Sequence, residues 1–432
     1  MSAGYAITTY KIQLNYKHLD WFKQTQCLFD AVLAFYYELL EKQPKALSLS
    51  NQNLLRHLEL QTIKQRDGTP PETPLPFEKI PLYFRRAAIN AAISMYRSYV
   101  GKLKAWQEGP IKSGKPSPPK CLHMSMLYYK GMYKDFDEKS ILLKLYTGKA
   151  WAWVKHRYTG RPFPENAELM SPTIVIKKKK VMLHIPVKEI VEDSRTAKER
   201  VKQNEKFVAV ALTGSDNLAV CTTIEADGRA TAPYFIKGGK ELAHRRKLLL
   251  GYTKRGIAGD NTPRLMAQPV GNAALSVPQE HRPNAKYYDK ITRLTDHYAH
   301  EVSRKIVDYA LKQGAKLIVL PELKESFDQA KKPYLGKTPY DFIGRRIARY
   351  VQYKAWQQGL VAMTSKPYYA STRCFHCNAP IARHNTEYQN PSPNFYGGKN
   401  FVCKDGHRGS TALNSARNLG KGFYARFYAG AA

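Results

Sequence analysis

The sequence predicts a multidomain α+β protein, and three observations lead to this fold class. The chain has 432 residues, 43% of them hydrophobic, which is enough for several domains with cores of their own. Residues 17–106 show mainly helical periodicity, whereas residues 121–188 and 207–236 are mainly typical of strands. Four metal-ligating side chains gather in a loop-rich stretch after residue 370. We therefore expect helical and strand-rich domains together with a small metal-binding module.

The N-terminal part is predicted to begin with one strand and to continue as a helical layer. The expected elements are a strand at 7–14 and helices at 21–40, 51–65 and 81–106. A Gly- and Pro-rich stretch at 109–120 then ends the helical layer. The last helix carries Arg85, Arg86 and Arg97, which we expect to contact phosphate groups. A solvated basic helix face is the alternative interpretation of these three arginines.

Two hairpins are predicted within residues 121–188. The first turns at Thr147–Lys149, between two runs rich in β-forming residues. The second carries four consecutive lysines at its tip: Lys177, Lys178, Lys179 and Lys180. Because four like charges repel each other unless a polyanion neutralises them, these lysines predict contact with an RNA backbone.

A mixed α/β domain is predicted from Phe207 onward. The buried-strand pattern of residues 207–212 is followed by a return strand at 217–220, and Leu317–Leu320 forms a central strand that ends at Pro321. Two basic helices are expected around residues 239–250 and 341–358. Their candidate nucleic-acid-binding residues are Arg245, Arg246, Arg345, Arg346 and Arg349.

The spacing of four residues predicts a structural metal site. Cys374 and Cys377 are separated by two residues, and Cys403 and His407 by three. Three sulfurs and one imidazole are a ligand set that zinc prefers, and four protein ligands leave no open position for catalysis. The alternative is three buried thiols beside a surface histidine.

The formal net charge of +34 predicts a polyanionic partner. The alternative is a ribosome-associated or merely soluble basic protein. No apolar run is long enough to span a bilayer and no signal peptide is visible, so no membrane partner is expected. Cysteines at zinc spacing, with the other three isolated, suggest a reducing, cytoplasmic location.

The segment A-L-N-S-A-R-N-L, which begins at Ala412 directly after the metal-site residues, carries a resemblance. A zinc ribbon that runs into D-x-N-A-A-R-N-I resembles the C-terminal region of TnpB proteins, the transposon-encoded, RNA-guided relatives of miniature type V CRISPR effectors. The resemblance implies a RuvC-like nuclease domain of RNase H fold with an inserted zinc ribbon. It covers residues 207–427 by motif and the N-terminal half by layout only.

In the resembled family, three carboxylates hold the catalytic metal ions. In this chain the matching positions are Ala211 (or Leu212, if the turn is aligned without an insertion), Pro321 and Ala412. Alanine and proline side chains offer no oxygen ligand, so the carboxylates that hydrolysis by two metal ions requires are missing. We expect no nuclease activity. Alanine at two positions would fit an engineered inactivation, whereas proline at the third fits a natural origin better.

The resemblance also implies a domain order. The expected parts are a wedge strand (1–16), a helical recognition lobe (17–120), a wedge β-barrel (121–195), a linker (196–206), the RuvC-like domain (207–366), the zinc ribbon (367–410) and the C-terminal RuvC-like part (411–432).

The function expected from this resemblance is that of the TnpB-like nuclease-dead repressors. A guide RNA would pair with double-stranded target DNA beside a short adjacent motif. The bound complex would block RNA polymerase in a bacterial, nucleoid-associated setting, with a monomer favoured. The alternatives are an inactive miniature type V effector that recruits a transcription partner, an endonuclease with a displaced site, and a basic zinc-ribbon DNA-binding protein without a guide.

Overall fold

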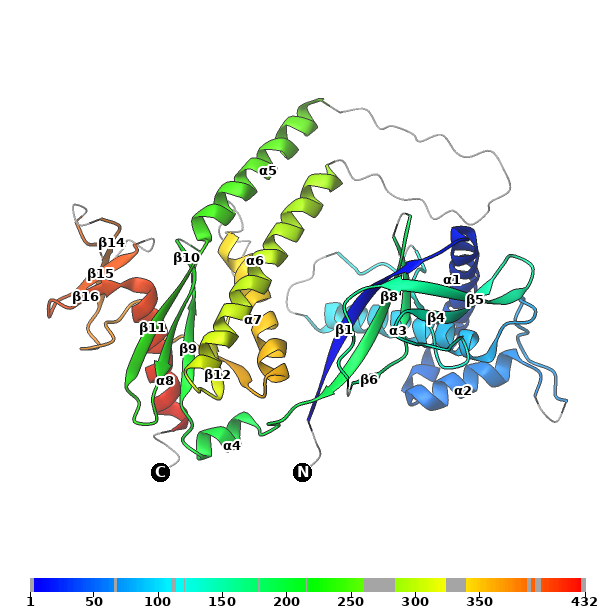
Figure 1. Ribbon diagram of the computed structural model, residues 1–432, viewed down its shortest axis with the longest axis horizontal. Coiled ribbons are helices and arrows are strands. Elements are labelled where there is room, and N and C mark those ends of the chain that lie inside the picture. The colour runs from blue at the N-terminus through cyan, green and yellow to red at the C-terminus, as the bar shows by residue number, and fades with distance from the viewer. Residues whose placement is uncertain are drawn as a thin grey trace. The chain divides into compact units, whose positions relative to one another are not determined.

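The chain forms two compact units. The N-terminal unit is built mainly from Ile7–Glu189, and the C-terminal unit from Ile190–Val270 and Gln279–Ala432 together with the first six residues of the chain. Figure 1 shows the computed structural model. The structure describes residues 4–65, 68–109, 114–119, 121–165, 167–177, 179–214, 216–259, 284–323, 339–386, 390–392 and 398–428.

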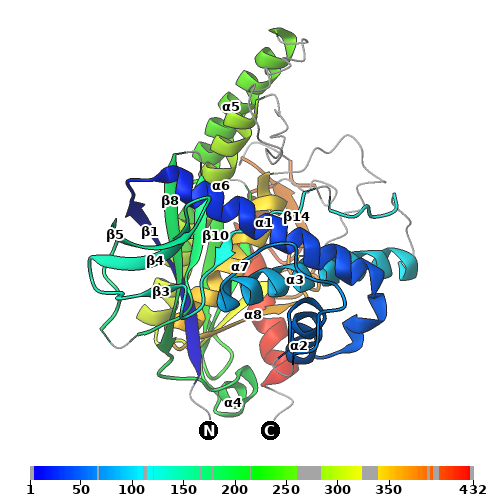
Figure 2. The same cartoon turned by 90° about the vertical axis from the view of Figure 1, so that its right-hand side faces the viewer.

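The helical layer of the N-terminal unit forms largely where apolar periodicity predicts it. Its elements are α1 (Leu19–Lys42), η1 (Pro44–Ser48), α2 (Asn51–Thr62) and α3 (Leu82–Glu108). Ser50 caps α2 by accepting a hydrogen bond from the backbone N–H of Asn53. α1 packs against α3 and also against a strand of the neighbouring sheet, so its apolar stripe is covered on both sides (Figure 2).

A curled sheet completes the N-terminal unit. Its strands are β1 (Tyr5–Asn15), β2 (Met126–Leu127), β3 (Tyr133–Lys134), β4 (Ser140–Tyr146), β5 (Trp151–Thr159), β6 (Glu168–Leu169), β7 (Thr173–Lys177) and β8 (Lys180–Ile190). The order is β2-β7-β8-β1-β5-β4-β3, with β6 paired to β8. The expected barrel is therefore an open sheet among the described residues, with β2 and β3 as its edges. The predicted first strand lies in the middle of this sheet.

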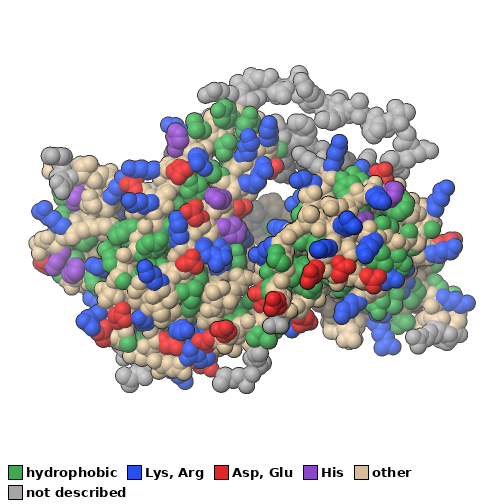
Figure 3. Space-filling model, in the orientation of Figure 1, with side chains coloured by type: hydrophobic (Ala, Val, Ile, Leu, Met, Phe, Trp, Pro, Cys, Tyr) green, Lys and Arg blue, Asp and Glu red, His purple; other side chains and the backbone are tan. Residues whose placement is uncertain are grey.

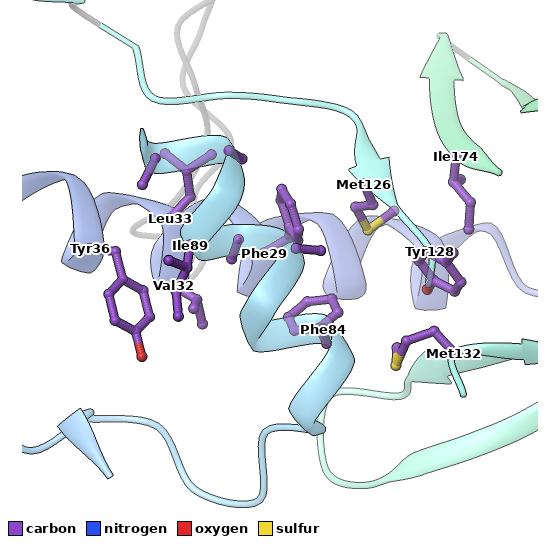
Figure 4. Close-up of a cluster of buried hydrophobic side chains, with 14 of the residues drawn as sticks. Phe29, Val32, Leu33, Tyr36, Phe84, Ile89, Met126, Tyr128, Met132 and Ile174 are labelled. Carbon is purple, nitrogen blue, oxygen red and sulfur yellow. The ribbon is translucent and has the colours of Figure 1, made fainter. Parts of the chain in front are cut away.

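The core of the N-terminal unit joins the helical layer to the sheet. Figure 4 shows Phe29, Val32 and Leu33 of α1 beside Phe84 and Ile89 of α3, with Met126, Tyr128 and Ile174 from the strand side. The rings of Phe29 and Phe84 meet edge to face, with centroids 5.4 Å apart. One continuous core therefore holds helices and strands that are more than a hundred residues apart in the sequence.

The C-terminal unit is organised by a five-stranded mixed sheet. Its strands are β9 (Phe207–Leu212), β10 (Asn217–Ile224), β11 (Ala230–Lys237), β12 (Leu317–Pro321) and β13 (Val361–Ser365), in the order β11-β10-β9-β12-β13. β11, β10 and β9 are antiparallel neighbours, whereas β9, β12 and β13 run parallel. β9 and β12 are buried along their whole length, as strands covered on both faces are.

Helices cover both faces of this sheet (Figure 1). They are α4 (Ala197–Lys202), α5 (Gly239–Gly259), α6 (Ala285–Lys312), α7 (Pro339–Gln357) and α8 (Thr411–Phe427). Val208 and Val210 face the core formed with α6 and α7. Phe207 and Ala209 face the opposite core, formed with α8. This alternation fixes which side of the sheet each later residue of β9 faces.

A small three-stranded sheet precedes α8. It consists of β14 (Ile381–His384), β15 (Asn400–Cys403) and β16 (Arg408–Ser410). Its own core is formed by Ile381, Phe401 and Ala379 around two cysteines. Among the described residues, none of the helices is long and apolar enough to cross a membrane.

Candidate functional site

The first part of the candidate site lies at the carboxyl ends of β9 and β12. The register of these parallel strands pairs Ile318 with Val208 and Val319 with Ala209. Two residues further along, Pro321 therefore reaches the level of Ala211. Because side chains alternate along a strand, both residues face the α8 side of the sheet, as Ala209 and Val319 do. The structure thus brings to one edge two of the three positions that the resemblance matches to catalytic carboxylates.

The start of α8, which carries the third position, Ala412, extends toward the same edge. The ring of Phe423 packs on Phe207 at the beginning of β9, with centroids 5.1 Å apart. Earlier in the helix, a Cβ at Gly420 would lie 3.0 Å from the Cβ of Ala209, so α8 runs antiparallel to β9 at close approach. Ala412 lies eight residues before Gly420, and a helix rises about 1.5 Å per residue. The first turn of α8, with Ala412, therefore extends past the carboxyl end of β9.

The neighbouring acids do not rebuild a carboxylate cluster within the part of the chain that the structure describes. Asp216 is engaged by two lysines, with 2.7 Å to Lys399 Nζ and 3.5 Å to Lys240 Nζ. The hydrogen bond from Lys399 is the main reason that the pKa of Asp216 is lowered. Glu322 is exposed at the end of β12. No group of three or more His, Cys, Asp or Glu residues gathers at this edge among the described residues.

The four predicted metal ligands do come together. The ligand atoms of Cys374, Cys377, Cys403 and His407 all lie within 4.8 Å of one another. Cys377 Sγ lies 3.6 Å from Cys403 Sγ, which in turn lies 3.4 Å from His407 Nδ1. Two sulfurs bound about 2.3 Å from one tetrahedral zinc would be about 3.8 Å apart. These four residues can therefore hold a metal ion with little rearrangement.

Local backbone geometry forms the two turns of this cluster. Asn378 has a φ of 60° directly after Cys377, and Gly406 has a φ of 78° directly before His407. Asparagine and glycine are the residues that adopt this left-handed conformation most easily. Although burial raises the pKa of Cys403, its hydrogen bonds with His407 and Cys377 lower it to about 7. A thiolate, the form that binds metal, is thereby favoured at this position.

Two asparagines of α8 hold the metal-binding segment on the helix. The Asn414 side chain donates to the carbonyl oxygen of Arg373 at 2.7 Å and accepts the backbone N–H of Phe375 at 2.8 Å. Asn418, one turn later, donates to the carbonyl oxygens of Arg373 at 2.7 Å and Ala370 at 3.1 Å. Sequence reasoning noted these residues only as part of a motif. Their spacing of four on one helix face was the available signal.

The arginines of α3 are mostly engaged inside the protein. Arg85 Nη2 lies 3.3 Å from Glu59 Oε1, and the Arg85 side chain is only 11% exposed. Arg86 makes a bidentate contact with the same carboxylate and is 40% exposed. The expectation that Arg85 touches phosphate is disfavoured by this geometry, because its guanidinium faces a buried acid. Its observed role is to hold α3 on α2.

Arg97 also has partners within the N-terminal unit. It donates to the side chain of Asn51 and, at 2.9 Å, to the carbonyl oxygen of Leu49. The guanidinium thus fastens the turn between η1 and α2. The contact of Arg97 with nucleic acid stays a prediction.

The predicted lysine tip is a hairpin in the structure. Lys177 at the end of β7 pairs with Lys180 at the start of β8, and Lys177, Lys179 and Lys180 are exposed. Lys178 lies outside the described residues. Their contact with an RNA backbone stays a prediction.

The arginines of α5 and α7 differ in their surroundings. Arg245 forms an ion pair with Glu241 at 2.7 Å, and Arg346 one with Asp296 at 2.5 Å. Arg349 lies over the ring of Tyr350, and Arg345 is exposed. The Nε and Nη1 atoms of Arg246 are buried without a hydrogen-bond partner among the described residues. Burial, and then the charge of Arg346, lower the pKa of Arg246.

Comparison with solved structures shows which class of fold this arrangement belongs to. The chain superimposes on the Cas12f1 chain of a Cas12f1-sgRNA-target DNA complex with a TM-score of 0.57 and 13% identity, covering 94% of this chain and 83% of that one. The mini-RNA-guided endonuclease CRISPR-Cas_phi3 is a more distant structural match, with a TM-score of 0.49 and 11% identity. The fold is therefore similar to that of the Cas12f1 chain in the first of these structures.

Sequence comparison indicates the same relatives. A segment is 30% identical over 139 residues to the CRISPR-associated endodeoxyribonuclease Cas12f1 of Sulfoacidibacillus thermotolerans. This match covers 32% of the chain and 29% of the relative's length. Residues 6–147 match the Aq_aa04 family. Over this segment the chain is therefore similar in sequence to Cas12f1, and the match spans less than a third of the length of that relative.

Proposed function

We propose that the protein is an RNA-guided, sequence-specific DNA-binding protein without nuclease activity. The observation that carries this proposal is that Ala211 and Pro321 lie at one sheet edge, toward which the first turn of α8, with Ala412, extends. Hydrolysis by two metal ions requires oxygen ligands at such positions, and these side chains provide none. The five-stranded mixed sheet with helices on both faces supports a RuvC-like domain that has kept its scaffold and lost its chemistry.

The Cys374–His407 cluster would bind a structural zinc ion. Its four donors are of the types that zinc prefers, and they would fill a tetrahedral coordination sphere. Zinc would supply stability to a module whose own apolar core contains few residues. Asn414 and Asn418 would then hold this module on α8, next to the degenerate edge.

The partners would be a guide RNA and double-stranded target DNA. The similar Cas12f1 structure is a complex with sgRNA and target DNA, and the net charge of +34 suits two such polyanions. Lys and Arg side chains are spread over the face of the molecule seen in Figure 3. The protein would hold the heteroduplex by shape and charge and would itself read a short adjacent duplex motif.

The cellular output would be transcriptional repression in the bacterial cytoplasm. A guided complex that binds DNA without cutting it obstructs RNA polymerase by occupying its path. Recruitment of a transcription partner would give activation instead, so the sign of the effect on a reporter gene decides between the two outputs.

The test begins with purification of the protein from its host without nuclease treatment and sequencing of the RNA that accompanies it. A single abundant RNA with a structured part and a short variable end would support guidance. A mixture of ribosomal and transfer RNA fragments would overturn it. The reconstituted complex is then incubated with matching duplex DNA and Mg²⁺. We expect binding without cleavage. Mg²⁺-dependent cleavage would contradict the proposal that the protein lacks nuclease activity.

A further inference from the structure

The N-terminal unit contains a pocket that the degenerate edge and the metal cluster do not involve. Its volume is about 520 Å³, within the range of about 300–1,000 Å³ typical of sites for small ligands. It opens between α3, the turn before β3 and the segment around β6. The side chains used below are Tyr83, Arg86, Asn90, Tyr129, Lys130 and Tyr133.

One wall of the pocket is an aromatic surface held in a fixed position. Tyr83 is 43% exposed, yet its ring lies against the backbone at Gly131. A Cβ at Gly131 would lie 2.6 Å from a ring carbon of Tyr83, and the φ of this residue is 100°. Glycine is therefore required for this close contact. Tyr129 and Tyr133 complete the aromatic lining, which is the kind of surface on which nucleobases stack.

A polar group with defined orientation lies beside this wall. Asn90 Nδ2 donates to the hydroxyl oxygen of Tyr129 at 3.1 Å, which fixes the rotation of the amide. That bond uses one amide hydrogen, and within the described part of the chain the second hydrogen and Oδ1 are left as a donor and acceptor pair. An asparagine amide matches the N6 and N7 edge of adenine in this way. Arg86 is held at the wall by its bidentate contact with Glu59.

We propose that this pocket takes one unstacked adenine base of the bound nucleic acid. The base would stack on Tyr83, its edge would meet Asn90, and Lys130 would lie near the attached phosphate. This inference rests on the proposed nucleic-acid function and adds to it a site for a single base. The base can come from the guide RNA or from the DNA, since both carry adenine.

Chemical modification of tyrosine in the full chain tests the occupancy of the pocket. The complex is treated with tetranitromethane as isolated, after ribonuclease treatment, and after ribonuclease treatment followed by addition of target duplex. Mass spectrometry then measures nitration of Tyr83 and of Tyr288, which is 50% exposed and lies outside the pocket. We expect Tyr83 to be protected at least 3-fold more than Tyr288.

The three arms distinguish the source of the base. Protection that ribonuclease removes assigns the base to RNA, and protection that appears only with duplex assigns it to DNA. Equal nitration of Tyr83 and Tyr288 in all arms would contradict base binding in this pocket but would not contradict guidance by RNA. Absence of any discrete RNA from the isolated protein would instead reject the proposed function itself.

Affinity measurements test the preference for adenine. Binding of short oligoadenosine and oligouridine strands to the full chain is compared for Asn90→Leu and for Asn53→Leu, a change on the exposed face of α2. Loss of a bidentate contact predicts a decrease of about 5-fold or more for oligoadenosine only. Equal effects on both strands would contradict the proposal. If Asn90→Leu fails to fold, Asn90→Ala, which also removes the amide and leaves a residue that a helix tolerates well, replaces it in the same comparison.

Discussion

Ala211 on β9 and Pro321 on β12 lie at the same level of two neighbouring parallel strands and face the same side of the sheet. The first turn of α8, with Ala412, extends toward this edge. Two of these positions thus lie side by side and the third belongs to a helix that extends toward them, although up to 201 residues separate them in the sequence. A metal site of three carboxylates would need such an arrangement. Whether carboxylates at these three positions would bind a metal ion can therefore be tested by substitution.

Restoring the three carboxylates is predicted to create a divalent cation site. In the triple variant Ala211→Asp, Pro321→Glu, Ala412→Asp, three negative charges would meet at one edge and repel each other without a cation. Mg²⁺ at 100 times its Kd would then stabilise the folded state by about 2.7 kcal/mol. Calorimetry with and without Mg²⁺ measures this as a rise in Tm. An equal rise in the unmodified protein would contradict the prediction.

Removal of one metal ligand is predicted to abolish metal binding by the Cys374–His407 cluster. We expect one zinc ion per chain by atomic emission spectroscopy, and none in Cys403→Ser, because the remaining three donors hold zinc far more weakly. Cys121→Ser, a change at an exposed cysteine outside the cluster, should keep the zinc. Full zinc content in Cys403→Ser would show that the ion binds elsewhere.

Substitution of Asn414 is predicted to loosen the metal-binding segment without unfolding α8. Asn414→Ala removes hydrogen bonds to Arg373 and Phe375, each worth about 0.5–1.5 kcal/mol. Hydrogen exchange of the amides in residues 370–377 should therefore speed up. Ser415→Ala is the control, because its hydroxyl donates to the carbonyl oxygen of Thr411 in the same helix and, among the described residues, to no other group. Equal exchange rates in the two variants would reject the role of Asn414.

The sequence predicted many of the elements that form the core and the spacing of the metal ligands, because both depend on local patterns. Apolar periodicity identified α1 and β9, and the Cys–His spacing identified a cluster that the fold assembles. The burial of Arg85 could not be predicted, since its partner Glu59 lies on another helix. The closure of the expected barrel likewise depends on pairing between distant strands, which periodicity does not encode.

Arg85 and the hairpin lysines are predicted to respond differently to substitution. Arg85→Met leaves Glu59 with one partner in a buried setting and should lower the free energy of unfolding by about 1–3 kcal/mol. Lys179→Ala, at an exposed tip, should leave stability unchanged within about 0.5 kcal/mol. If Lys179 contacts one phosphate, its removal reduces the slope of log affinity against log salt by about 1. Urea denaturation and RNA binding at several salt concentrations measure the two effects. Lower stability in Lys179→Ala than in Arg85→Met would contradict the prediction that Arg85, and not Lys179, stabilises the fold.

The segment that precedes β9 carries an ion-pair network with a predictable response to acid. Arg195 contacts Asp193 at 2.7 Å, and the fully buried Arg200 contacts it at 3.1 Å. Arg200 also donates to the carbonyl oxygen of Gly359 at 2.9 Å, which ties the segment to the end of α7. The hydrogen bonds from Arg195, with burial opposing them, hold the pKa of Asp193 well below its ordinary value of 3.8.

A carboxylate whose pKa is lowered by folding stabilises the folded state above its unfolded pKa, and this contribution is lost as the pH falls. The stability of the protein should therefore decrease from about pH 5 downward, and Asp193→Asn should show a flatter decrease in that window. At pH 7 the variant should already be less stable, because Arg200 keeps its buried charge with one acidic partner fewer. Urea midpoints at pH 7, 5 and 4 measure both effects. Parallel pH profiles for the two proteins would contradict the prediction, because they would show that Asp193 is not the group that titrates.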